Sequence, residues 1–387
     1  MALDLKLTAE QEQLERDARF YLENKVPAGL EEELETEFEG GGPIYGRFMR
    51  QLGSDGWLGI GWPKEFGGQG RSPIEQYIFF GLTLGYYRIP LPMLTVNAIG
   101  PVIMQTGTEE QKRRFLPPIL KGELIIAIGC TEPEAGTDLA SLKTAAVKDG
   151  DYYIINGQKS FTTMGQFCDY IWLATRTDPN VPKHKGISMF LVDAKTPGIS
   201  VQPLMTMSGL RTTYTFYENV RVHKDFLIGE ENKGWFYLNH HLAGERIGLV
   251  PHYAPLRYLE DIMKWVKEHG LGSNTVIRNK LAETAIETEV LRLLNYRVAW
   301  MLTQGRAPHA ESAMIKVFGS EQALRVLGDC FDIMGLFGQL QTGSKWVPFR
   351  GRLETMLRVS VVNLFGGGAN EVLRDVVAAS KGLPVSR

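Results

Sequence analysis

The order of hydrophobic patterns along the chain limits the possible folds most strongly. Up to about residue 124, and again after about residue 232, apolar residues recur at the spacing of amphipathic or buried helices. Between these stretches lie short β-branched and aromatic runs separated by turn residues. We therefore predict an α+β multidomain fold: an N-terminal helical domain (1–124), a central antiparallel β-domain (125–232) and a C-terminal helical domain built as a four-helix bundle (233–387).

Local signals refine this prediction. Thr8 and Gln11 have the spacing of a capping box at the start of the first helix, and Pro27 would end that helix. Residues 72–92 predict a mostly apolar helix that is buried all round, and residues 108–123 a helix interrupted by prolines. Asp149-Gly150, between two strand-like runs, predicts a β-hairpin.

Bulk properties exclude several function classes. The 387 residues allow two or three domains, and the net charge of -2 gives no global attraction for nucleic acid or an anionic membrane. No apolar run is long enough to span a bilayer, and the acidic N-terminus resembles neither a secretory signal nor a transit peptide. Three widely spaced cysteines predict reduced thiols in a cytoplasmic protein, with no metal site.

Two stretches of the β-domain carry candidate binding residues. Residues 130–144, "CTEPEAGTDLASLKT", are rich in small and hydroxyl side chains, so the loop can cradle a phosphate or the edge of a heterocycle. Residues 156–165, "NGQKSFTTMG", place Phe161 beside two threonine hydroxyls after a strand. Taken separately, a surface turn and a core aromatic explain them better than a cofactor site.

Together with four further stretches in the same order, they resemble the acyl-CoA dehydrogenase family over nearly the whole chain. The six stretches are 61–70, 107–123, 130–144, 155–165, 217–235 and 366–384. The resemblance implies bound FAD, α,β-dehydrogenation of an acyl-CoA thioester, and an electron-transfer flavoprotein as electron acceptor. In that reaction a carboxylate removes the proton α to the thioester, and the β-hydrogen leaves as hydride to the flavin.

The resemblance also assigns site residues by position. Phe161 matches the aromatic, usually tryptophan, that flanks the isoalloxazine, and Thr137 would lie near the FAD pyrophosphate. The implied cofactor contacts are Cys130 (through its backbone), Thr131, Thr137, Phe161, Thr163, Gly367 and Gly368. The implied substrate contacts are Thr137, Arg246 and Gly367.

The glycine run in "LFGGGANEVLRD" lies where much of the family carries its catalytic base in a Glu-Gly-Thr step. Gly367 stands at the position of that glutamate and Ala369 at the position of the threonine. The spacing is not that of a Walker or dinucleotide-binding loop. Gly367 keeps the backbone N–H that holds the thioester carbonyl in the family, and it leaves room for a bulky acyl group.

A second carboxylate is the predicted base. Glu245 falls at helical spacing in a stripe whose other members are Trp235, Leu238, Leu242 and Leu249. A carboxylate among apolar residues is costly unless it is paired or has a use, and burial raises its pKa, as a base requires. Some family branches carry their base at this position in a Glu-Arg step, which matches Glu245-Arg246. The alternative is that Glu245 pairs with His241 or Arg246.

His240 and His241 are adjacent, so they project in different directions and make a poor metal site. No metal is predicted.

Two departures from the family pattern concern the FAD site across the subunit interface. In the family, an arginine after the helix that carries Tyr258 reaches the FAD pyrophosphate of the neighbouring subunit; here no residue matches it, and Arg278 is the nearest but out of register. The family's later glutamine–glycine step, which contacts the adenine half of FAD, reads "DIMGLFG" here, with Asp332 and Gly335. The pattern resembles a branch whose members form mixed tetramers of related chains. These act on bulky acyl-CoAs, including branched, alicyclic, dicarboxylic and steroid-derived ones.

Three functions remain open. The first is an acyl-CoA dehydrogenase that uses Glu245, as a homotetramer or as a heterotetramer with a related chain. The second is a subunit that completes the FAD site of a mixed tetramer and has little activity alone. The third is a flavin monooxygenase on the same fold, which would not need Glu245.

Overall fold

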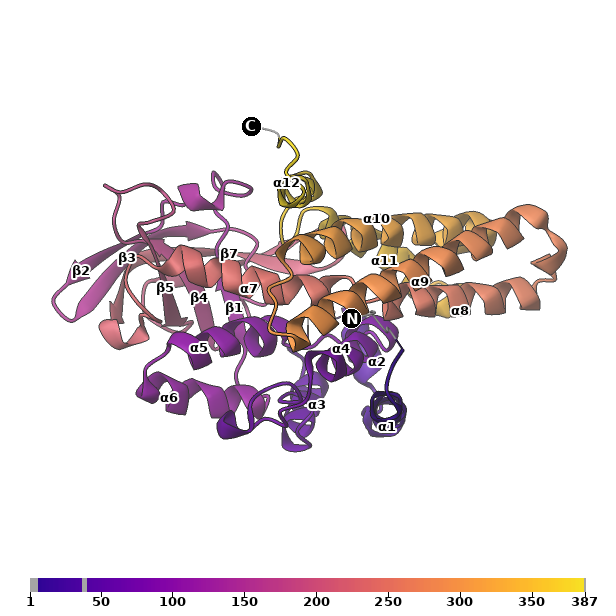
Figure 1. The fold of residues 1–387 in the computed structure, drawn as a ribbon, viewed down its shortest axis with the longest axis horizontal. Coiled ribbons are helices and arrows are strands. Elements are labelled where there is room, and N and C mark those ends of the chain that lie inside the picture. The colour runs from indigo at the N-terminus through magenta and orange to yellow at the C-terminus, as the bar shows by residue number, and fades with distance from the viewer. Residues whose placement is uncertain (1–5, 37–39, 386–387) are drawn as a thin grey trace.

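The structure is a computed structural model of the chain that describes residues 6–36 and 40–385, except for the side chains of residues 240–247. Figure 1 shows a sheet domain at one end, long helices extending to the other end, and the N-terminal helices packed along one side. The order helical, β, helical is the predicted one. The exact bounds 1–124, 125–232 and 233–387 stay a prediction.

The N-terminal part is helical. Capping boxes begin three of its helices, the predicted one at Thr8 and two others at Ser72 and Thr108. The helices are α1 (Ala9–Lys25), α2 (Leu30–Thr36), α3 (Pro43–Ser54), α4 (Pro73–Gly81), α5 (Gly100–Thr106) and α6 (Glu109–Leu120).

Two predictions for this part need correction. The helix predicted over 72–92 is α4 continued by the π-helical η2 (Leu82–Tyr86), and helical structure resumes only in the π-helical η3 (Leu94–Ile99). Pro90 and Pro92 explain the break, because proline lacks the N–H that a helix interior needs. In contrast, α6 is continuous although Pro117 and Pro118 lie inside it.

The described residues of the middle part form a seven-stranded sheet in the order β1-β4-β2-β3-β7-β6, with β5 paired to β4. The predicted hairpin at Asp149-Gly150 joins β2 to β3, with Gly150 in the left-handed region. The strands are β1 (Ile126–Gly129), β2 (Ala145–Asp149), β3 (Tyr152–Lys159), β4 (Tyr170–Arg176), β5 (Ile187–Asp193), β6 (Ile199–Met205) and β7 (Arg211–His223).

The sheet is mixed rather than wholly antiparallel. Strand β1 runs parallel to β4, with Ile126 opposite Tyr170, and β2 meets β4 in one parallel pair. The other pairings, β2–β3, β3–β7, β4–β5 and β6–β7, are antiparallel as predicted. A parallel pair needs a long connection, and residues 130–169, which include β2 and β3, supply it between β1 and β4.

The C-terminal part contains α7 (Gly234–Leu249), α8 (Tyr253–Glu268), α9 (Thr275–Thr303), α10 (His309–Met334), α11 (Arg352–Ser360) and α12 (Asn370–Ser380). Helices α8, α9 and α10 run side by side as the extended bundle of Figure 1, and their shared core includes Ile262, Val326 and Leu327. Helix α7 contacts β5, η3 and α10, so it links all three parts. Among the described residues, no helix is long and apolar enough to cross a bilayer.

Candidate active site

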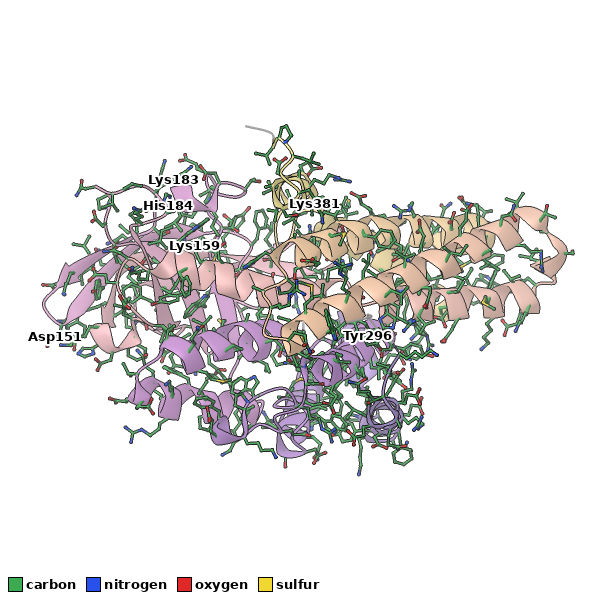
Figure 2. All side chains as sticks on the ribbon, in the orientation of Figure 1. Asp151, Lys159, Lys183, His184, Tyr296 and Lys381 are labelled. Carbon is green, nitrogen blue, oxygen red and sulfur yellow. The ribbon has the colours of Figure 1, made fainter. Side chains whose placement is uncertain are left out.

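The loop after β1 is held in shape by a buried ion pair. The Glu132 carboxylate accepts hydrogen bonds from the backbone N–H groups of Lys143 (2.6 Å) and Thr144 (2.8 Å), which closes the loop. From β3, Lys159 Nζ donates to Glu132 Oε1 (2.8 Å) and to the Cys130 carbonyl (3.0 Å). The two side chains are 0% and 7% exposed, and Figure 2 shows Lys159 inside the sheet domain.

Burial and pairing act in opposite directions on these two groups. Burial lowers the pKa of Lys159, although the Glu132 carboxylate favours its ammonium form. Burial also opposes ionisation of Glu132, but the Lys159 charge and the loop hydrogen bonds hold the pKa of Glu132 below its ordinary value. Glu132 is therefore a carboxylate that fixes residues 130–144.

Our sequence analysis missed this pair, although a signal was present. Lys159 follows Tyr153 and Ile155 at the two-residue spacing of one strand face, and all three are buried. A lysine on a buried face requires a carboxylate partner.

Phe161 is exposed, in contrast to a core aromatic. Its ring is 58% exposed, and its φ of 58° lies in the left-handed region that favours glycine. The next residue, Thr162, is clamped to β7: its N–H donates to the Thr213 carbonyl (2.9 Å), and Thr213 Oγ1 donates to the Thr162 carbonyl (2.7 Å). Such strained backbone persists where the surroundings enforce it, and it is common at functional sites.

Polar side chains near Phe161 in the fold have atoms without partners. Ser160 Oγ, both side-chain polar atoms of Gln166, and Thr212 Oγ1 are buried without a hydrogen-bond partner in the part of the chain that the structure describes. Each such atom costs about 1–3 kcal/mol unless a partner satisfies it. A planar heterocycle with donors and acceptors along its edge fits this surface, with Phe161 beside its ring. The sequence analysis did not identify Ser160, Gln166 or Thr212.

Four of the predicted cofactor residues lie close together. The Ser160 N–H donates to the Thr131 carbonyl (2.8 Å), and the Cys130 carbonyl is held by Lys159, so residues 130–131 lie beside the step before Phe161. Thr163, two residues further on, is exposed. Thr137, in the middle of the loop, is exposed, and no hydrogen bond joins it to the other four.

The glycine turn at 367–368 is anchored to α10. Lys316, fully buried, donates to the Gly368 carbonyl (2.6 Å) and to Asn370 Oδ1 (2.8 Å) at the start of α12. Gly367 and Gly368 have φ of 68° and 108°, values that side-chain-bearing residues rarely adopt. Lys316 and Asn370 are further residues that the sequence analysis missed.

The glycine turn also contacts α7. A Cβ atom added to Gly367 would lie 2.6 Å from Leu249 Cδ1, at the C-terminal end of α7. Position 245 precedes Leu249 by one turn of α7. Leu238, another member of the predicted stripe, is buried in the core. The side chains of His240, His241, Glu245 and Arg246 lie outside the described residues.

Comparison with known proteins gives the family. Models of the acyl-CoA dehydrogenase N-terminal, middle and C-terminal domains match residues 8–123, 127–220 and 232–382. The acyl-CoA dehydrogenase FadE29 of Mycobacterium tuberculosis is 43% identical over 390 residues, covering 99% of each chain. The chain belongs to the acyl-CoA dehydrogenase family. It is therefore an oxidoreductase that acts on acyl-CoA, and members of its family are flavoproteins that bind FAD.

Solved structures agree with this family. This acyl-CoA dehydrogenase is similar to the steroid ACAD Tcur3481-Tcur3483, with a TM-score of 0.94 and 42% identity over 99% of this chain and 100% of the other. It is also similar to a chain of the ChsE4-ChsE5 complex from Mycobacterium tuberculosis, with a TM-score of 0.92 and 39% identity over 99% and 100% of the two chains.

Proposed function

We propose that this acyl-CoA dehydrogenase oxidises a bulky acyl-CoA, with Glu245 as the base and FAD bound beside Phe161. The observation that carries the proposal is the contact between Gly367 and Leu249. The contact places Gly367, where the family usually has its catalytic glutamate, against α7, one helical turn from position 245. The Glu245 carboxylate would then serve as the base in place of that glutamate, from the α7 side of the site.

The residues around Phe161 fit a flavin. Phe161 would flank the ring, and Thr131, Thr163 and the backbone at Cys130 would bond its edge. Ser160, Gln166 and Thr212 offer buried polar atoms that have no hydrogen-bond partner among the described residues. Thr137, exposed on the same loop, would face the pyrophosphate and the substrate. When bound, the flavin accepts the β-hydrogen as hydride.

The chain's own groups would prepare the substrate for proton loss. The backbone N–H of Gly367 would donate to the thioester carbonyl, which stabilises the negative charge that develops when the α-proton leaves. Glu245 would take that proton, and Arg246 would contact the substrate. Because neither Gly367 nor Ala369 has a large side chain, the site leaves space for a bulky, branched, alicyclic or steroid-derived acyl group. The similarity to a steroid ACAD supports this substrate class.

A mixed tetramer, in which a related chain completes the FAD site, is favoured over a homotetramer by the charges at the far end of the bundle. There Lys280, near the start of α9, pairs with both Asp329 and Asp332 of α10, the latter at 2.8 Å. Two carboxylates facing one ammonium are a poor environment for a pyrophosphate. The Arg278 guanidinium, also near the start of α9, donates to the Gly272 carbonyl. Nearby, Leu336 is 82% and Trp346 67% exposed, as at a subunit interface.

The remaining parts of the proposal rest on the family. An electron-transfer flavoprotein would reoxidise the flavin, and the chain would act as a tetramer, with copies of itself or with a related chain. The similarity to the ChsE4-ChsE5 complex supports the mixed assembly. A cytoplasmic location is supported by Cys130, Cys168 and Cys330, which are buried thiols.

The test is the visible spectrum of the purified chain, alone and mixed with a related chain. We expect bound flavin whose absorption is lost when linear, branched and alicyclic acyl-CoAs are added without oxygen, with an enoyl-CoA as product. Flavin bound only by the mixture would favour the mixed tetramer over the self-sufficient enzyme. Flavin that no acyl-CoA reduces under either condition would refute the proposed activity.

A further inference from the structure

A cavity of about 490 Å³ lies between α1, α2, the segment after η2, α8 and α11. Its volume is in the range of small-molecule sites. None of the residues proposed above for flavin or thioester lines it. Its apolar walls are Leu22, Val26, Leu30, Leu34, Ile89 and Met356.

The break between η2 and η3 brings an arginine to this cavity. Arg88 lies two residues after the end of η2 and has a φ of 58°, in the left-handed region, while Pro90 and Pro92 prevent the helix from continuing. The Arg88 guanidinium carbon lies 5.2 Å from the ring centroid of Tyr258 on α8. Its Nε and Nη2 are buried and have no hydrogen-bond partner within residues 6–36 and 40–385, the side chains of 240–247 excepted.

Arg88 differs from the other arginines of the cavity. Each of the other four has a carboxylate within ion-pair distance: Arg257 has Asp261, Arg350 has Glu35, Arg352 has Glu31, and Arg358 has Glu354. Among the described residues no carboxylate pairs with Arg88. The cavity carboxylate of Glu23 accepts from the Tyr87 hydroxyl (2.7 Å) instead.

The neighbouring Arg352 is affected by the charge of Arg88. Burial lowers the pKa of Arg352 and the Arg88 charge lowers it further, against the opposing effect of the Asp261 carboxylate. A partly buried guanidinium without a counter-ion is costly, so an anionic group that reached Arg88 would gain a charge-assisted interaction and would relieve its repulsion of Arg352.

We propose that this cavity binds an apolar carboxylic acid, with its carboxylate on Arg88 and its hydrocarbon body against the six apolar side chains. One unpaired guanidinium matches one negative charge, and the planar carboxylate suits its two parallel N–H groups. A phosphate dianion would bring a second charge close to Glu23 and Glu31.

The test is calorimetric titration of the purified protein with adamantane-1-carboxylate and with the neutral 1-adamantanemethanol. We expect the acid to bind at least about tenfold more tightly than the alcohol, the size of one charge-assisted contact. Arg88→Gln should weaken the acid about tenfold and leave the alcohol unchanged, while Arg88→Lys should keep most of the preference. Acid that does not bind, or that binds Arg88→Gln as well as the wild type, would overturn the proposal.

Two further variants serve as a control and as a second test of the cavity. Arg292→Gln is the matched control: its guanidinium also lies over a tyrosine ring, 5.6 Å from the centroid of Tyr296, but outside the cavity. It should bind both compounds like the wild type. If Arg88→Gln fails to fold, Met356→Trp, which fills the cavity, should weaken the acid and the alcohol alike; unchanged binding of both would refute the site.

The carboxylate could belong to a free acid or to the far end of an acyl-CoA. The mono-CoA ester of adamantane-1,3-dicarboxylic acid and the CoA ester of adamantane-1-carboxylic acid separate these sources. Displacement of bound adamantane-1-carboxylate by the first ester only would assign the cavity to the end of an acyl group. Displacement by neither would assign it to a free acid. Since this binding needs no flavin reduction, it is tested independently of the dehydrogenase activity.

Discussion

Replacing Lys159 by methionine should destabilise the protein severely. Lys159→Met keeps most of the side-chain volume but leaves the Glu132 carboxylate buried without its counter-ion. It also removes the donor to the Cys130 carbonyl. Both losses fall on residues 130–144, which we propose as one wall of the flavin site.

The magnitude follows from the geometry. Unit charges 2.8 Å apart attract by about 6 kcal/mol at an effective dielectric constant of about 20. The cost of removing both charges from water offsets much of this attraction, but that cost remains for Glu132 when only the lysine is removed. Breaking a buried pair in this way costs about 3–5 kcal/mol. The two backbone N–H donors to Glu132 favour the lower part of this range.

The assay is urea unfolding, together with the flavin content of the purified protein. We expect Lys159→Met to lose about 3 kcal/mol of unfolding free energy and most of its flavin. Lys143→Met is the control, because this lysine belongs to the same loop but forms an exposed pair with Glu134, and it should unfold like the wild type. The double variant Lys159→Met/Glu132→Gln should be more stable than the sum of the two single losses predicts, by more than about 1 kcal/mol.

Additive losses in the double variant, or a loss below about 1 kcal/mol in Lys159→Met, would refute this reasoning. Either result would mean that the ion pair does not hold the loop.

Two further predictions concern the glycine turn and a buried histidine. Gly367→Ala should lower the free energy of unfolding in urea by about 1–2 kcal/mol and slow turnover, because φ is 68° and the new Cβ would meet Leu249. Gly272→Ala is the control, because Gly272 has open space around it and an ordinary φ. Equal effects of the two substitutions would contradict this account. Burial lowers the pKa of His252 from 6.5 to about 3, so the folded protein holds it neutral and the unfolded chain takes up a proton below pH 6.5. Stability should therefore be lost as pH falls from 6.5 towards 3, by about 3 kcal/mol at pH 4.5. His252→Gln should lose about that much less than the wild type between pH 7.5 and pH 4.5 in urea unfolding, and equal losses would show that His252 is not neutral in the fold.

Local patterns in the sequence predicted the order of the helical and β parts, the capping box at Thr8 and the hairpin at Asp149-Gly150. They did not predict the parallel pairing of β1 with β4. That pairing joins residues 126 and 170, and a two-residue alternation carries no information on which distant strand lies alongside. The end of the helix at Tyr86 could have been predicted from Pro90 and Pro92, but the apolar pattern continued past the break.

In the candidate site, too, some residues were predicted from the sequence, while others depend on contacts between distant parts of the chain. Phe161 and Thr163 were assigned by family position, whereas the exposure of Phe161 depends on its left-handed backbone and on the clamp between Thr162 and Thr213. Lys159 and Lys316 were missed because a lysine is usually solvated, and each lies in the interior only through partners far away in the sequence. The helical stripe of α7 and the family position gave position 245, which stays a prediction, and Leu249, one helical turn further along α7, lies against Gly367.

The most direct test of the central claim is the rate at which an acyl-CoA reduces the bound flavin in Glu245→Gln. If Glu245 is the base, the variant should bind flavin like the wild type but reduce it at least about 100-fold more slowly, the usual contribution of a general base. Glu230→Gln, an exposed carboxylate before α7, should react like the wild type. Flavin reduction in Glu245→Gln at the wild-type rate would contradict the account, because the proton would then leave to another group.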